Sequence, residues 1–341
     1  MLTKFLIHIV YLLYSKLIIL EIIIRSNLFS NIKLLYSGWD GGFGFGDHVT
    51  FCVNIKSKIN KNSKLFCYSN QQFETAKFFY EKKYLIKSIF SIPKFLSESG
   101  IGFKYLITDK NFKPQKLMSP HNKKLKLTLN YGTDEQIKYI KNRLDKFEIS
   151  AKLKKILQDK TIAFAIKYYP YNKKKNSDIL FQRRQTRNLK KIYKLLHIIC
   201  NKNINVVLLG KKKNHFIKTI SGKKLIDNKK IFLFDDLSEN YSIADQVYLA
   251  ENASGYIGSG AGDMIFFDTL KKKTLLIDYT WVENLNLYLK NRKCLFKTVQ
   301  NKKNKKIEVF NWLKVYNSKY HKLIENSYDE IYKAAKKKFN F

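Results

Sequence analysis

Short apolar segments alternate with helical segments between residues 161 and 278, and this order most restricts the possible folds. Strands are expected at 161–169, 204–210, 231–236, 255–259 and 274–278, with helices at 188–203, 240–253 and 262–272. Strands that are separated by helices run parallel and need helices on both faces of their sheet. The sequence therefore predicts an α/β protein with a doubly wound, Rossmann-like sheet.

The first half of the chain repeats this alternation. Strands are expected at 32–37 and 64–69, and helices at 48–59, 71–84 and 133–147, the last with Thr133 as its N-cap. A chain of 341 residues is long enough for two domains. We expect an apolar helix at 1–30, a first Rossmann-like domain at 31–155, a second Rossmann-like domain at 156–305 that faces the first across a cleft, and basic helices at 306–341.

The net charge of +38 suggests an anionic partner. The lysines are spread along the whole chain together with abundant Ile, Asn, Phe and Tyr, which is typical of compositional drift toward A/T-rich codons. This distribution favours solvated lysine faces over a dedicated nucleic-acid surface. We therefore expect no nucleic-acid partner, while the charge favours anionic small substrates and acidic lipid headgroups.

The cysteines and histidines give no metal-binding pattern. The four cysteines, Cys52, Cys67, Cys200 and Cys294, form no CxxC pair, and the six histidines form no HxxxH or HExxH. Asp235 and Asp236 are adjacent carboxylates but lack a third ligand at a suitable spacing. We expect no metal and no cofactor.

Residues 5–24 are strongly apolar but contain His8, Lys16 and Glu21. A charge near the centre of a spanning helix costs roughly 2.5–3.5 kcal/mol. No small-residue cleavage site follows, which argues against a removed signal peptide. Three interpretations remain: a helix in the membrane interface, a helix packed on the protein, or a poor single span. The basic balance favours the first, in a cytoplasmic protein that contacts an acidic membrane surface peripherally.

The segment GSGAGD at 258–263 lies between a strand and a helix. Its glycines let the backbone approach a ligand, and the amides that open the helix can bind an anion. Asp263 can cap those amides or bind a sugar hydroxyl. The alternative is that the glycines only allow close packing. The donor-binding candidates here are Ser259, Gly260, Ala261, Gly262 and Asp263.

Three arginines follow the first strand of the second domain, in a chain whose cations are mostly lysine. Arg183, Arg184 and Arg187 can form bidentate bonds to phosphate oxygens. Lys211, after the strand at 204–210, is a further candidate phosphate contact. The alternative for all four is a solvated loop with local ion pairs.

The segment GGFGFGDHVTF at 41–51 follows the first strand of the first domain. Gly42, Gly44 and Gly46 leave room for a bulky group and are expected to form an acceptor-side loop. Asp47 can act as a general base or as a helix N-cap. His48 is a second catalytic candidate, with a partly buried packing role as the alternative.

The segment at 235–246 joins a strand to a helix. Ser238 or Asn240 is expected to cap that helix. Its carboxylates could reach a ribose or a base; they are Asp235, Asp236, Glu239 and Asp245.

Segments 236–278, 187–210 and 44–51 resemble GT-B glycosyltransferases of the heptosyltransferase and bacterial surface-polysaccharide types. The resemblance implies a first domain that holds the acceptor, with Asp47 as catalytic base, and a second domain that holds a nucleotide-sugar donor. In heptosyltransferases an acidic residue precedes the S/T-G turn and a histidine follows it. Here Gly258 and Asp263 occupy those positions, so the donor sugar stays open.

The expected function is metal-independent transfer of a sugar from a nucleotide-diphosphate donor to a glycan or lipid-linked acceptor in cell-surface polysaccharide biosynthesis. Two alternatives remain. A nucleotide-sugar epimerase could use the same architecture, and a non-enzymatic nucleic-acid-binding protein would fit the charge.

Overall fold

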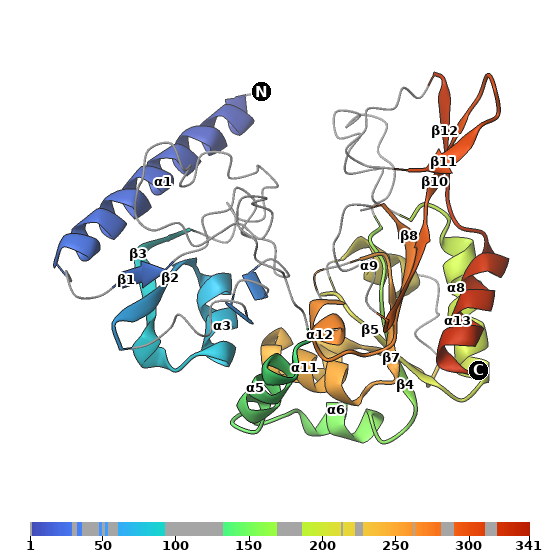
Figure 1. The fold of residues 1–341 in the computed structure, drawn as a ribbon, viewed down its shortest axis with the longest axis horizontal. Helices are drawn as coiled ribbons and strands as arrows, with labels where there is room; N and C mark the ends of the chain where they lie inside the picture. The colour runs from blue at the N-terminus through green and yellow to red at the C-terminus, as the bar shows by residue number, and fades with distance from the viewer. Residues whose placement is uncertain are drawn as a thin grey trace. The chain divides into compact units, whose positions relative to one another are not determined.

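The structure of the chain is a computed structural model. The described residues are 2–28, 33–35, 48–49, 52–53, 61–92, 132–168, 186–212, 214–221, 228–260, 262, 264–280, 290–310 and 319–341. They belong to two compact units, Met1–Asn130 and Tyr131–Phe341 (Figure 1). Each unit contains its own parallel sheet.

The first unit has three described strands in the order β1-β2-β3, all parallel. They are β1 (Lys33–Leu35), β2 (Ser63–Ser69) and β3 (Leu85–Ile92), and the helical elements are α1 (Leu2–Leu28), α3 (Asn70–Phe79) and the 3-10 turn η2 (Lys82–Tyr84). Ser69 ends β2 and caps α3, because its side chain accepts a hydrogen bond from the Gln72 amide at 3.2 Å. The apolar face of α3, with Ala76, Phe78 and Phe79, is buried.

The second unit contains a six-stranded parallel sheet in the order β6-β5-β4-β7-β8-β9. Its strands are β4 (Thr161–Ala165), β5 (Asn205–Leu208), β6 (Ile231–Leu233), β7 (Gly255–Gly258), β8 (Thr274–Tyr279) and β9 (Arg292–Phe296). The strand order reverses between β4 and β7, as in a doubly wound Rossmann sheet. The predicted α/β class and the Rossmann-like sheet are therefore confirmed.

Helices cover both faces of this sheet. Figure 1 shows α8 (Leu189–Asn201) beside α13 (Tyr328–Phe339) on one side of the strands, with α11 (Ile243–Asn252) and α12 (Met264–Thr269) on the other. The remaining helical elements are α5 (Asp134–Leu144), α6 (Ala151–Ile156), α9 (His215–Ser221), α10 (Phe234–Leu237) and the 3-10 turn η5 (Glu239–Tyr241). The core of this unit joins side chains from the sheet to α8, α9 and α13.

Helix α5 confirms its predicted start and packs within the second unit. Thr133 and Gln136 form a reciprocal capping box at its N-terminus. The helix contacts α11, and Lys141 pairs with Glu251 of α11 at 2.9 Å. The compact unit thus begins near residue 131, upstream of the boundary at 155–156 that the alternation suggested.

The C-terminal region differs from the helical tail expected from residue 306. A small antiparallel sheet, in the order β11-β10-β12, precedes α13; its strands are β10 (Thr298–Asn301), β11 (Ile307–Val309) and β12 (His321–Ile324). Val299 and Phe310 are buried together with Leu323 packed against them. This local apolar cluster explains why the segment pairs as strands although lysines surround it.

Helix α1 packs on the sheet of the first unit, where it contacts β1 and β3. Ile18 and Ile22 are buried, and Glu21 is 5% exposed. Among the helices that the structure describes, α1 included, none has the length and apolarity needed to cross a membrane.

Candidate functional site

The strand order places the candidate site at the carboxyl ends of β4 and β7. Ser259 joins the two ends: its Oγ accepts a hydrogen bond from the Lys167 amide at 2.6 Å, and its own amide donates to the Ala165 carbonyl at 3.0 Å. The Ser259 side chain is buried. Ligands of doubly wound sheets bind where the strand order reverses, so Ser259 shapes the floor of that position.

Both glycines around Ser259 have a packing reason in the structure. A Cβ on Gly258 would come within 2.4 Å of the Ala165 carbonyl oxygen of the neighbouring strand. Gly260 has φ +73°, and a Cβ there would lie 2.7 Å from Tyr279 Cε2. The close-packing interpretation therefore applies to Gly258 and Gly260, while a role in donor binding stays a prediction.

The helix after this turn is shorter than the sequence pattern indicated. It begins at Met264 and ends at Thr269. The helix does not continue past this end, because Lys271 adopts a left-handed conformation with φ +55°. The Gly262 carbonyl accepts the Ile265 amide at 3.2 Å, which fixes the first turn. Ala261 and Asp263 lie outside the described residues, so their predicted roles stay predictions.

A second group of candidates lies where β5 ends. The Gly210 amide donates to the Tyr241 hydroxyl at 2.6 Å, and Lys211 Nζ lies 5.9 Å from the centre of the Tyr241 ring. Asn240 and Tyr241 both have positive φ, 53° and 57°. Two consecutive non-glycine residues in this conformation mark a strained turn. The Lys211 side chain is exposed on the same edge of the sheet as Ser259.

The two carboxylates that follow β6 both contact Lys212 of the same chain. Asp235 accepts the Lys212 amide at 2.9 Å, and Asp236 forms an ion pair with the Lys212 side chain. In the described part of the chain, no three His, Cys, Asp or Glu side chains lie close enough to hold a metal ion.

Helix α11 begins one turn later than expected. Ser242 is its N-cap, in place of Ser238 or Asn240. Ser238 instead donates through its hydroxyl to Asp245 at 2.7 Å, and the Ser150 amide donates to the same carboxylate at 3.0 Å. Asp245 is buried, and its hydrogen bond with the Ser150 amide connects the start of α6 to α11.

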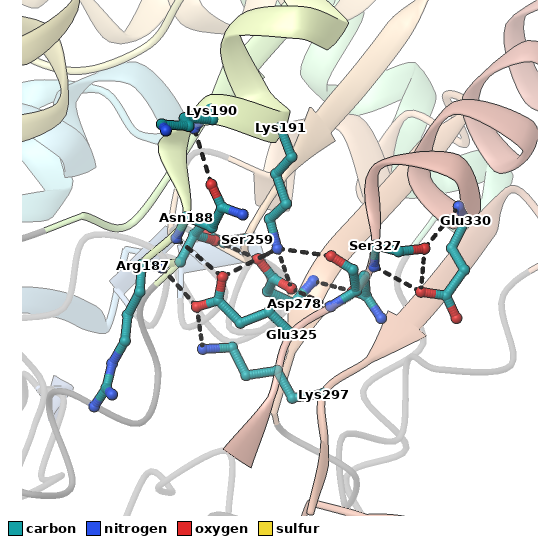
Figure 2. A network of polar contacts seen from close by, with 12 residues as sticks. Arg187, Asn188, Lys190, Lys191, Ser259, Asp278, Lys297, Glu325, Ser327 and Glu330 are labelled. Atoms are coloured by element: carbon teal, nitrogen blue, oxygen red, sulfur yellow. Dashed lines mark hydrogen bonds and ion pairs between the residues drawn. The ribbon is translucent and has the colours of Figure 1, made fainter. Parts of the chain in front are cut away.

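Arg187 lies just before α8, on the carboxyl side of the sheet. Its backbone amide donates to Glu325 at 2.6 Å, and the Asn188 amide donates to the same carboxylate at 3.1 Å (Figure 2). Glu325 thus satisfies the amides at the start of α8. The Arg187 side chain is exposed and remains a candidate phosphate contact, whereas Arg183 and Arg184 lie outside the described residues.

A buried charge network supports this edge of the sheet, and sequence reasoning missed it. Lys191 Nζ donates to Asp278 at 2.8 Å, to Glu325 at 3.1 Å and to the Asn326 carbonyl at 2.9 Å, while Lys297 pairs with Glu325 at 3.5 Å (Figure 2). Burial lowers the pKa of Lys297. Burial alone would raise the pKa of Glu325, but Lys297 and Lys191 hold it below its ordinary value. The network fixes α8 and the end of β8 to the segment before α13.

Sequence signals for this network existed but were incomplete. Lys191 lies among the apolar residues of α8 that face the protein core. Asp278 lies near the end of β8, after a run of apolar residues. A lone cation among core positions and a carboxylate at a strand end both suggest a buried partner. Neither signal identifies that partner, because Glu325 is separated from Lys191 by 134 residues.

His48 is the first described residue after the glycine-rich segment. It is 3% exposed, and its Nε2 lies 3.0 Å from the Gln72 carbonyl and 3.5 Å from Cys52 Sγ. Burial lowers the pKa of His48 to about 4, and the Gln72 carbonyl only partly opposes this. A neutral buried ring fits the packing role better than acid–base chemistry near neutral pH. Asp47, Gly42, Gly44 and Gly46 lie outside the described residues.

We expect the first unit to lose stability as the pH falls from 6.5 to 4. Unfolded His48 takes up a proton below its ordinary pKa of 6.5, whereas folded His48 stays neutral until about pH 4. The unfolded state binds more protons in that range, and the loss attributable to His48 reaches about 3 kcal/mol. The measurement is hydrogen–deuterium exchange in peptides from β2 and α3 across this range.

The variant His48→Gln should flatten this pH dependence, and His197→Gln, at an exposed histidine of α8, should not. Equal profiles for the wild type and His48→Gln would show that His48 does not cause the pH dependence.

No family model matches the chain, and no curated protein matches its sequence. Among solved structures, it is similar to the E. coli ADP-heptose LPS heptosyltransferase II, with 11% sequence identity and a TM-score of 0.33, over 78% of this chain and 90% of that chain. A likeness at this level carries no argument about function. By its own geometry the chain is an α/β protein whose second unit is a doubly wound, Rossmann-like sheet.

Proposed function

We propose that the protein is a metal-independent glycosyltransferase that moves a sugar from a nucleotide-diphosphate donor to a glycan or lipid-linked acceptor of the cell surface. The observation that carries the proposal is the junction of β4 and β7, where Ser259 bridges the strand ends at the reversal of strand order. In doubly wound sheets this position binds nucleotides. The resemblance of segments 236–278, 187–210 and 44–51 to GT-B glycosyltransferases extends this from nucleotide binding to sugar transfer.

The donor side of the proposal uses cations on the carboxyl edge of the sheet. Arg187 precedes α8 and Lys211 follows β5, and both side chains are exposed there. Arg183 and Arg184 belong to the segment that joins β4 to α8. These cations, with the backbone amides of residues 260–263, would stabilise the negative charge that develops on the departing diphosphate. No cofactor enters this scheme, because the nucleotide sugar is the donor substrate.

The acceptor side of the proposal depends on Asp47. His48 is anchored to Gln72 and stays neutral, which leaves the adjacent Asp47 carboxylate as the better general base. Its role would be to take the proton from the attacking hydroxyl while the sugar passes through an oxocarbenium-like state. Gly42, Gly44 and Gly46 would leave room for the acceptor.

The test is a thermal-shift screen of the purified chain with UDP, GDP, ADP and CMP and their sugars. One diphosphate should raise the melting temperature, because a ligand at 100 times its Kd stabilises the folded state by about 2.7 kcal/mol. The variant Arg187→Ala should weaken that binding by roughly tenfold or more, since it removes a charge-assisted contact. Lys202→Ala is the matched control, because this exposed lysine lies at the opposite end of α8.

Three results would overturn parts of this proposal. Equal stabilisation of the wild type and Arg187→Ala would remove Arg187 from the diphosphate site. If no nucleotide stabilises the chain while random oligonucleotides bind with steep salt dependence, the basic charge serves nucleic-acid binding instead. Conversion of a nucleotide sugar without an acceptor would favour the epimerase.

A further inference from the structure

Helix α1 presents an apolar stripe to solvent. Leu13 is 57% exposed and Leu20 is 49% exposed, although both are large apolar side chains. They belong to a series at spacings of three and four residues, so its members share one side of the helix. The outward stripe consists of Leu6, Ile9, Leu13, Leu17, Leu20 and Ile24.

The opposite side of α1 is fixed to the protein. Ile18 and Ile22 are buried, and Glu21 accepts hydrogen bonds from the Ser88 hydroxyl at 2.6 Å and from the Ile89 amide at 3.0 Å. Arg25 pairs with the same carboxylate at 2.8 Å. These contacts bind α1 to β3 and set which side of the helix faces outward.

A helix on the surface of a globular protein normally turns its polar residues outward. In α1 the outward side is apolar from Leu6 to Ile24, a length of about 27 Å at 1.5 Å per residue. Contiguous apolar surface of this kind marks a docking site for protein or membrane. The stripe therefore needs an occupant.

The charges around the stripe favour an anionic lipid surface. The described residues of the first unit contain three acidic side chains, and each is in an ion pair: Glu21 with Arg25, Glu74 with Lys77 and Glu81 with Lys83. Lys16 is exposed beside the stripe, and the whole chain has a net charge of +38. A helix with one apolar side and basic neighbours lies in the headgroup region, where cations attract acidic lipids.

We propose that α1 docks the protein peripherally on an anionic membrane, with the stripe from Leu6 to Ile24 in the boundary between headgroups and acyl chains. The inner face of α1 remains bonded to β3 through Glu21. The proposal does not depend on the glycosyltransferase activity, and its test uses no sugar nucleotide.

The experiment is co-sedimentation of the full chain with vesicles of phosphatidylcholine alone or with added phosphatidylglycerol. The wild type should bind the vesicles that contain phosphatidylglycerol, and more weakly at high salt. The variant Leu13→Gln/Leu20→Gln should reduce its partition coefficient at least about tenfold, because two half-exposed apolar side chains no longer enter the acyl boundary. The matched control is Ile307→Gln/Val309→Gln, which changes two exposed apolar residues of β11 and should bind as the wild type does.

Circular dichroism melting shows whether both double variants fold as the wild type does, and a misfolded variant is replaced by Leu6→Gln/Leu13→Gln. Absence of binding to phosphatidylglycerol vesicles overturns the proposal, as does equal binding by the wild type and the stripe variant. A stripe-dependent dimer that does not bind vesicles would assign the stripe to a second copy of the chain and would also overturn it. An equal reduction in the control shows that the stripe is not the docking surface.

Discussion

Arg292→Met should lower the free energy of unfolding of the second unit by about 3–5 kcal/mol, because it leaves a buried carboxylate without its partner. Arg292 begins β9 and donates through Nε to Asp268 of α12 at 3.3 Å, with a second ion-pair contact between the same groups. Both side chains are fully buried. Burial raises the pKa of Asp268 to about 6 although Arg292 opposes the shift, so at neutral pH the carboxylate is mostly ionised.

The measurement is urea unfolding followed by hydrogen–deuterium exchange in peptides from β7, β8 and β9. The double variant Asp268→Leu/Arg292→Met should recover most of the loss, because apolar replacement of a buried pair is often neutral. Lys271→Met is the control for an exposed pair: Lys271 and Asp134 lie 2.9 Å apart, and its removal should cost about 0–1 kcal/mol. A loss in Arg292→Met no larger than in Lys271→Met would show that the buried pair is energetically replaceable.

Asp47→Asn should reduce sugar transfer by about 10²–10⁴-fold, which is the usual contribution of a general base. Asparagine keeps the size of the side chain but cannot accept the proton of the attacking hydroxyl. The change is adjacent to His48, whose ring is held by Gln72, so the neighbouring packing should persist. Turnover is measured as release of the nucleoside diphosphate in the presence of a glycolipid extract of the cell envelope.

The same variant should keep the nucleotide-induced rise in melting temperature, because Asp47 is assigned to the acceptor. Asp40→Asn is the matched control, since it removes an aspartate that directly precedes the glycine-rich segment 41–51. Wild-type turnover in Asp47→Asn would exclude Asp47 as the base. Loss of both turnover and nucleotide stabilisation would assign Asp47 to donor binding instead.

Five strands of the second unit could be predicted, because most of them contain short apolar runs; β9, which begins with Arg292 and Lys293, is a strand that the sequence pattern did not predict. Val206, Val207 and Leu208 of β5 are all fully buried, and so are Leu275, Leu276 and Ile277 of β8. A parallel sheet covered on both faces requires such runs, so the local sequence determines the strand. The start of α5 could also be predicted from neighbouring residues, since the Thr133 capping box involves residues three positions apart.

The polar contacts were not predictable, because their partners are distant in sequence. The sequence indicates Ser259 as a donor-binding residue, but its short contact with the Lys167 amide depends on the pairing of β4 with β7. The sequence suggests a need for backbone freedom at Gly260, and the structure adds the Tyr279 ring, with which a side chain there would collide. The network around Asp278 likewise needs α8 and the segment before α13 to be in place.

The hydrogen bond from the Ile89 amide to Glu21 holds α1 against β3, so that α1 covers this strand of the first unit. Strand β3 is one of the two outer strands among the three described, and outer strands with open amides recruit strands of other molecules. A shortened protein that starts at residue 29 would therefore uncover β3 and expose the surface against which Ile18 and Ile22 pack. Removing the apolar helix to improve solubility would then promote strand-to-strand aggregation.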